Sequence, residues 1–112
     1  MICDVHAHYI PLKFSQFMRD RFPPRVGVPD KTGIARHPVS DSPDDDQGRF
    51  ALMDAAGVER QILSPHRQPY LPDEAEGVAA IHLLNDGYAE LAARHPAHIS
   101  SYVMLPLPHR QQ

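Results

Sequence analysis

The 112-residue chain is 42% hydrophobic and 22% charged, which suits one globular domain or part of a larger one. A formal net charge of -3 with scattered basic residues excludes the basic footprint of a nucleic-acid-binding protein, and no apolar run approaches the roughly 20 residues of a membrane span. The single cysteine excludes an internal disulfide and the amino terminus lacks a signal-peptide pattern, so we expect a cytoplasmic protein.

The first predicted element is a strand in ICDVHAHYIP, residues 2 to 11, which is rich in apolar and β-branched side chains. Side chains alternate between the faces of a strand, so His6 and His8 are expected on the same face. The predicted faces are Ile2, Asp4, His6 and His8 on one side, and Cys3, Val5 and Ala7 on the other. Two imidazoles that converge in this way could hold one divalent metal ion, whereas Cys3 is expected to pack.

Residues 11 to 48 are irregular and contain six of the twelve prolines. Within this stretch, LKFSQFMRDRF spaces its aromatic residues for one short amphipathic helix, and the rest is expected to be loop. The acidic run Asp44-Asp45-Asp46 could be a metal site. Because the run precedes a helical pattern, we expect it instead to supply the N-cap of a helix.

Predicted helices and strands alternate in the second half of the chain. RFALMDAAG, from residue 49, predicts a helix that ends at Gly57, and VERQILSP predicts a strand. Asp73 and Glu76 have the capping-box spacing of another helix, which should run to about Arg94. ISSYVMLPL predicts the last strand, closed by Pro106. Strands separated by helices predict βαβ units and a parallel sheet, and hence the α/β class.

Three blocks of the sequence resemble the metal-dependent amidohydrolase superfamily: DVHAH, MDAAGVERQILSP, and LNDGYAELAARHP leading into SYVMLPLPH. The subgroup that they resemble is related to aminocarboxymuconate-semialdehyde decarboxylase. The resemblance implies a (β/α)8 barrel of the TIM type. These residues would supply its amino-terminal part, with three parallel strands, two main helices and one long insertion. We therefore expect 1–112 to be an incomplete barrel domain with an irregular, proline-rich insertion at 11–48.

The resemblance also implies one divalent metal ion, with zinc as the expected metal. It makes His6 and His8 metal ligands, and Asp4 a residue that supports them by hydrogen bonding. The remaining ligands and the acid/base group are expected beyond residue 112. Since a catalytic zinc normally has three protein ligands, the 112-residue chain alone is expected to lack turnover.

The substrate implied by the resemblance is a small-molecule carboxylate or carbonyl compound. Arg36, in the insertion, could pair with a substrate carboxylate, although solvent exposure is the alternative for this side chain. His66 follows the second predicted strand and could contact the substrate, as could His109 after the third. The histidines expected at the surface are His82, His95 and His98.

The reaction implied by the resemblance is the decarboxylation of an aromatic or unsaturated carboxylate, in which the metal polarises a substrate oxygen. A metal-dependent hydrolase of an amide, ester or lactone is the first alternative. An inactive truncated remnant and a small α/β binding module with structural histidines stay open as well. Self-association into a homo-oligomer is compatible with each of these functions.

Overall fold

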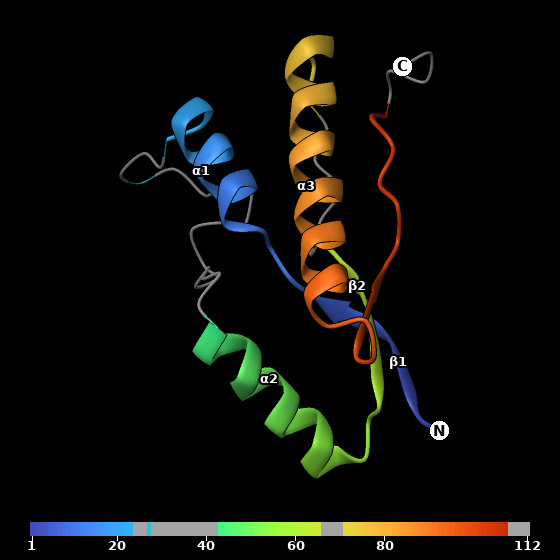
Figure 1. The fold of residues 1–112 in the computed structure, drawn as a ribbon. Coiled ribbons are helices and arrows are strands. Elements are labelled where there is room, and N and C mark those ends of the chain that lie inside the picture. The colour runs from blue at the N-terminus through green and yellow to red at the C-terminus, as the bar shows by residue number, and fades with distance from the viewer. Residues whose placement is uncertain (24–26, 28–42, 66–70, 108–112) are drawn as a thin grey trace.

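The computed structural model describes residues 1–23, 27, 43–65 and 71–107 (Figure 1). Its sheet has three parallel strands in the order β1-β2-β3, with β1 at Cys3–His8, β2 at Arg60–Ser64 and β3 at Ile99–Ser101. The helices are α1 at Leu12–Arg21, α2 at Pro43–Ala56 and α3 at Glu74–Arg94. The α/β class and the parallel sheet are confirmed. None of the described helices combines the length and the apolar character that a membrane-crossing segment needs.

One face of the sheet forms the core together with the helices. The pairing register places Ala7, Leu63 and Ile99 on this face, and all three are buried. The long helix α3 packs against β3 and carries α1 on its side, an arrangement visible in Figure 1. Apolar residues recur along α3 at steps of three and four, and this stripe is buried, including Leu84 and Tyr88.

The opposite face of the sheet is less covered, and we call it the open face. By the same register it carries Cys3, His8, Arg60, Ile62, Ser64 and Ser100. These residues are exposed or half-buried, in contrast to the buried residues of the helical face. In a closed barrel this face would point to the interior. In the described part of the chain the face is accessible, including His8 at the end of β1.

Helix α2 begins earlier than the sequence predicted. It starts at Pro43 rather than at residue 49, and proline suits a first helical position because its missing N–H would be unpaired there. The acidic run at residues 44 to 46 therefore lies in the first turn and does not supply the N-cap, although its charge still complements the positive end of the helix dipole. The predicted end is correct, since Gly57 adopts a φ of 73°.

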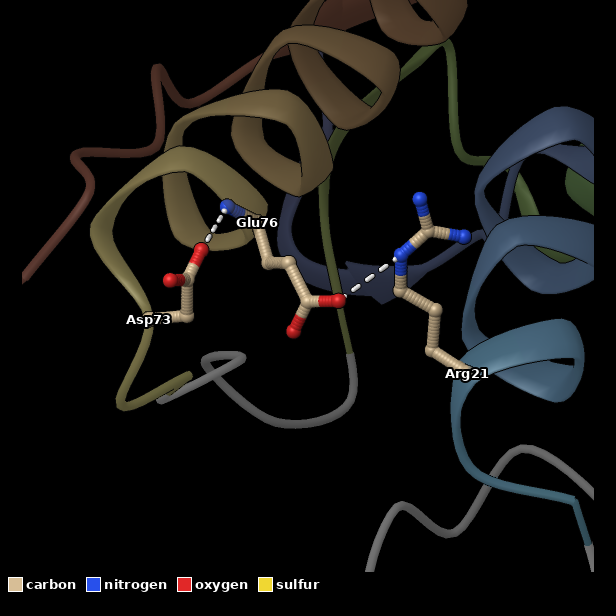
Figure 2. A network of polar contacts seen from close by, with 3 residues as sticks. All are labelled: Arg21, Asp73 and Glu76. Atoms are coloured by element: carbon tan, nitrogen blue, oxygen red, sulfur yellow. Dashed lines mark hydrogen bonds and ion pairs between the residues drawn. The ribbon is translucent and has the colours of Figure 1, made fainter.

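Helix α3 begins at the predicted cap, but only half of the predicted capping box forms. Asp73 accepts a hydrogen bond of 2.8 Å from the backbone N–H of Glu76 (Figure 2). The carboxylate of Glu76 turns away from the cap and pairs with Arg21 Nε of α1 at 2.9 Å. The residue expected to close the cap therefore joins two helices instead.

The region where α3 ends and β3 begins differs from the prediction in two ways. Strand β3 spans only Ile99–Ser101, three residues, and does not extend to Pro106. His95 and His98 are half-buried rather than at the surface, because both rings pack against Phe50 of α2 with centroid distances of 4.6 and 4.7 Å. His95 Nε2 also lies 3.4 Å from the buried carboxylate of Asp46. These contacts tie α2 to the end of α3. His82 is exposed, as predicted.

Candidate functional site

The two histidines of the first strand are neighbours in space. His8 is the last residue of β1 and therefore lies at the carboxyl end of the strand. The imidazole rings of His6 and His8 stand edge to face, with centroids 5.0 Å apart and an interplanar angle of 83°. The convergence predicted from their spacing is confirmed, and their role as metal ligands stays a prediction.

The rest of β1 does not alternate as the sequence predicted. Asp4 pairs with Gln61 and Ala7 with Leu63, so three steps along β1 match two steps along β2. One extra residue is thus accommodated between Asp4 and Ala7, which is the mark of a β-bulge. Because a shift of one residue exchanges the faces of a strand, the faces before the bulge are reversed relative to those after it.

Two sequence predictions change as a result. Asp4 shares the helical face with Ala7 rather than the open face with His8. Its Oδ1 accepts a hydrogen bond of 3.0 Å from the backbone N–H of His6, so it supports the backbone of the histidine pair and contacts no imidazole in the described hydrogen bonds. Cys3 shares the open face with His8 and is exposed, so the expectation that it packs is wrong.

The ring of His8 is oriented by the neighbouring strand. His8 Nδ1 lies 3.3 Å from the carbonyl oxygen of Ser64, its register partner on β2. A carbonyl oxygen only accepts hydrogen bonds, so this contact requires the tautomer with hydrogen on Nδ1. A metal would then bind at Nε2, and a carbonyl behind a ligating imidazole is the usual way of fixing its orientation.

Side chains from two helices hold the backbone where β1 ends. Arg49 of α2 donates from Nη2 to the carbonyl oxygen of His8 at 2.9 Å and from Nη1 to Gln61 Oε1 at 2.9 Å. Tyr88 of α3 donates its hydroxyl to the carbonyl oxygen of Tyr9 at 2.6 Å. The burial of Tyr88, together with the nearby Tyr9, raises the pKa of its phenol far above the ordinary value, although Arg49 opposes the shift.

Sequence reasoning missed Arg49 and Tyr88 as supports of the histidine pair. The ring of Tyr88 lies in the buried apolar stripe of its helix, and helical spacing alone does not reveal the bond of its hydroxyl. Arg49 is the first residue of the segment that predicted the helix ending at Gly57, but its reach to the end of β1 depends on where α2 lies. A polar head on an otherwise core-facing helix position is the only signal that the sequence carries.

The spacing of the imidazoles fits a shared metal ion. Imidazole nitrogens bind zinc at about 2.0–2.1 Å, which puts the centroids of two rings on one ion roughly 5 Å apart. The observed separation of 5.0 Å agrees. In residues 1–23, 27, 43–65 and 71–107, however, no group of three or more His, Cys, Asp or Glu side chains is placed to hold a metal. His6 and His8 therefore fit two positions of a metal site.

The other predicted contacts are not placed by the structure. Arg36 and His66, predicted to contact the substrate, lie outside the described residues, as does His109. A wide hollow of about 600 Å³ lies between α2 and the sheet and is lined by Asp4, Arg49 and Gln61 among others. That hollow is on the helical side of the sheet, so it is not a binding cavity for the histidine pair.

Comparison with solved structures gives the fold a set of relatives. A protein described as amidohydrolase II matches with a TM-score of 0.70 at 23% identity, over 97% of this chain and 33% of that chain. A 4-oxalomesaconate hydratase from Rhodopseudomonas palustris matches with a TM-score of 0.61 at 21% identity, over 95% and 33%. A dihydroxybenzoic acid decarboxylase from Polaromonas sp. JS666, with bound manganese and the inhibitor 2-nitroresorcinol, gives 0.65 at 25% identity, over 95% and 30%.

These matches concern one part of each relative. The chain spans about a third of the length of the solved structures that it matches. No model of a known protein family matches the sequence, and no curated protein matches it. The three strands with their helices correspond to the first third of barrel-type chains. In structure, the chain therefore matches the amino-terminal third of proteins of the amidohydrolase 2 family, as its sequence blocks predicted.

Proposed function

We propose that this chain is the part of an amidohydrolase-type enzyme that supplies the first two metal ligands, His6 and His8. The enzyme would decarboxylate an aromatic or unsaturated carboxylate. The observation that carries the proposal is the pair of adjacent imidazoles at the carboxyl end of β1. Active sites of (β/α)8 barrels lie at the carboxyl ends of the strands, so the location of the pair at that end of β1 supports a part in the chemistry.

The chain's own groups prepare this site in three ways. The Ser64 carbonyl sets the tautomer and direction of the His8 ring. The Asp4 carboxylate holds the backbone N–H of His6, which limits the freedom of the bulge. The open face of the sheet leaves room for a substrate next to both rings. A divalent metal held there would polarise a substrate oxygen and lower the pKa of a bound water.

The choice of decarboxylation rests on the relatives. One matched structure is a decarboxylase with manganese and an aromatic inhibitor, and another is a hydratase. The manganese supports a divalent metal but not zinc in particular, so the proposal covers both ions. A carboxylate substrate would need a cationic partner, and Arg36 and His66 are the proposed contacts. Hydrolysis of an amide, ester or lactone is the alternative reaction, and the test described below measures it alongside decarboxylation.

The metal site is tested by titrating the 112-residue chain with Zn²⁺ and with Mn²⁺ in a calorimeter. We expect weak binding with one ion per chain, because two imidazoles are fewer ligands than a closed site provides. His6→Ala and His8→Ala should each abolish measurable binding. His82→Ala, an exposed histidine on α3, is the matched control and should bind as the unaltered chain does. Equal binding by all four proteins would refute the proposed ligands.

The reaction is tested with the protein that the longer reading frame encodes. We expect the coding DNA to continue in frame past codon 112 and to encode further β-strands, another histidine and an aspartate. The protein from that longer frame, loaded with Mn²⁺ or Zn²⁺, should release carbon dioxide from dihydroxybenzoates or related acids. Release of an alcohol or amine from esters or amides would support the hydrolase. A stop codon directly after codon 112 would support the inactive remnant.

A further inference from the structure

We infer that Arg49 is a positioning residue for the histidine pair: its guanidinium group locks the carboxyl end of β1 to β2 and thereby sets the orientation of the His8 imidazole. The inference deepens the proposed function and takes its significance from it. It concerns a side chain on α2 that touches neither imidazole in the described contacts and acts through the backbone.

The guanidinium group makes two bonds at once, and they reach different strands. Nη2 donates to the His8 carbonyl on β1, and Nη1 donates to the Gln61 side chain on β2, both at 2.9 Å. The same group lies 5.7 Å from the centroid of the Tyr9 ring, within the range of a cation–π contact. Because the donors of arginine form a rigid planar fork, fixing both acceptors fixes their mutual position.

The two acceptors lie on opposite sides of the bulge. Gln61 is the register partner of Asp4, which precedes the irregularity, whereas His8 follows it. The ladder is disrupted between these points, so backbone pairing alone holds the carboxyl end of β1 less firmly. Arg49 bridges this gap from outside the strand.

The position of the His8 backbone decides where its ring points. His8 Nδ1 reaches the Ser64 carbonyl only while the two residues stay opposite one another. A shift of the His8 backbone would break this contact and move the ring relative to His6. Arg49 binds the carbonyl oxygen of the same residue. Removal of the Arg49 guanidinium should therefore change the tautomer and the orientation of the His8 ring first.

Arg60 supplies a matched comparison. Like Arg49, it is half-buried, but it lies on β2 itself. Its Nη1 donates to Ser100 Oγ at 2.9 Å and its Nη2 to the Pro96 carbonyl at 3.0 Å. Its register partner is Cys3, at the end of the sheet away from His8. Removal of either arginine should lower the stability of the fold, but only Arg49 should affect the histidine pair.

The test reads the histidine rings by nitrogen-detected and NOE NMR on the labelled 112-residue chain, without metal. The pH is kept at about 8.5 in every sample, so that the variants are compared under the same conditions. The unaltered chain should show His8 with hydrogen on Nδ1 and an NOE between the rings of His6 and His8. Arg49→Gln should shift His8 toward the Nε2–H tautomer and weaken that NOE at least twofold, whereas Arg60→Gln should change neither.

Two further variants keep the test decisive if Arg49→Gln fails to fold. Arg49→Lys retains the charge but can reach only one acceptor at a time, so it should give an intermediate His8 signal. Gln61→Met removes one anchor of the fork and should give a smaller change than Arg49→Gln in the same direction. Unchanged His8 tautomer and NOE in the Arg49 and Gln61 variants would overturn the inference.

A Zn²⁺ titration separates this inference from the proposed function. If the unaltered chain binds the ion, Arg49→Gln should weaken binding roughly 10- to 100-fold, the range seen when a partner behind a metal-binding histidine is lost. Arg60→Gln should bind as the unaltered chain does. If the unaltered chain binds no ion, the proposed ligands fail, while the ring signals still decide the role of Arg49.

Discussion

At the scale of single residues, the backbone after the histidine pair depends on two side chains that the helices insert. Arg49 holds the carbonyl of His8 and Tyr88 holds the carbonyl of Tyr9. Tyr88 is fully buried, so its hydroxyl loses water on folding and needs this acceptor. Burial favours the neutral phenol over the phenolate, which is why the pKa of Tyr88 is raised. The bond and the raised pKa make separate predictions about stability.

Tyr88→Phe should reveal both effects in urea denaturation. At pH 8 the variant should be less stable by about 1 kcal/mol or more, since the partly buried carbonyl of Tyr9 loses its donor. Above about pH 10 the tyrosine of the unfolded chain ionises while the folded one keeps its proton. The stabilisation by Tyr88 is therefore present below that pH and is lost as the pH rises through the raised pKa.

The difference between the two proteins should consequently narrow when the pH is raised from 8 to about 10.5, above the ordinary pKa of tyrosine. Tyr102→Phe is the comparison, because the Tyr102 hydroxyl is exposed and its bond to the Val5 carbonyl is long at 3.4 Å. It should cost less at pH 8 than Tyr88→Phe. A constant difference between the unaltered chain and Tyr88→Phe across the alkaline range would contradict the prediction.

At the scale of elements, α1 and α3 approach closely at one glycine. A Cβ atom added at Gly87 of α3 would lie 2.5 Å from Pro11 Cγ and closer still to Pro11 Cβ. Proline is rigid, so this clash cannot be relieved by a flexible side chain. Gly48 of α2 is also helical, but a Cβ added there meets nothing within 4 Å. The two positions separate helix propensity from packing.

Gly48→Ala and Gly87→Ala should change stability in opposite directions. Alanine is preferred to glycine in a helix, so Gly48→Ala should stabilise the chain by about 0.5–1 kcal/mol. Gly87→Ala gains the same preference but must push Pro11 away, at a net cost of about 1–3 kcal/mol. Urea denaturation of the two variants measures both. Equal effects at the two glycines would show that the helices can separate at Pro11 without cost.

The elements also show which features the sequence could predict. The long helix α3 was predicted with its cap and its end because hydrophobic spacing and an N-cap residue are local signals. The bulge in β1 was not predicted, because alternation describes a regular ladder and the extra residue arises from pairing with β2, more than fifty residues later. Asp4 and Cys3 were placed on the wrong faces for that reason. The same distance in sequence hid the reach of Arg49.

At the scale of the whole molecule, the described part of the sheet has an open face and two open edges. β1 and β3 each pair with β2 alone. Large apolar side chains within or next to these two strands are exposed, including Ile2 and Val5 at 57% and Val103 at 75%. A parallel sheet is normally covered on both faces, and open edges invite pairing with another chain. The part of the chain that the structure describes therefore exposes apolar surface to water.

We expect the isolated chain to self-associate as its concentration rises. Sedimentation velocity over a range of concentrations should show a shift from monomer to larger species. Val103→Glu, next to β3, should weaken the association because it charges the open sheet region. Leu52→Glu on α2 is the control, since Leu52 is equally exposed at 74% but lies on a helix. A monomer at all concentrations, with a cooperative unfolding transition of several kcal/mol, would contradict the prediction.

The bulge in β1 also bears on how this stretch can change in length. His8 faces Ser64, and the extra residue lies between Asp4 and Ala7, where Val5 is exposed. Deleting Val5 would leave a regular ladder in which His8 keeps its partner. The position of the imidazoles is thus set by the strand pairing after the bulge, where His8 faces Ser64. Gain or loss of one residue before that pairing need not displace the imidazoles, so the length of the amino-terminal segment can change while the histidine pair keeps its position.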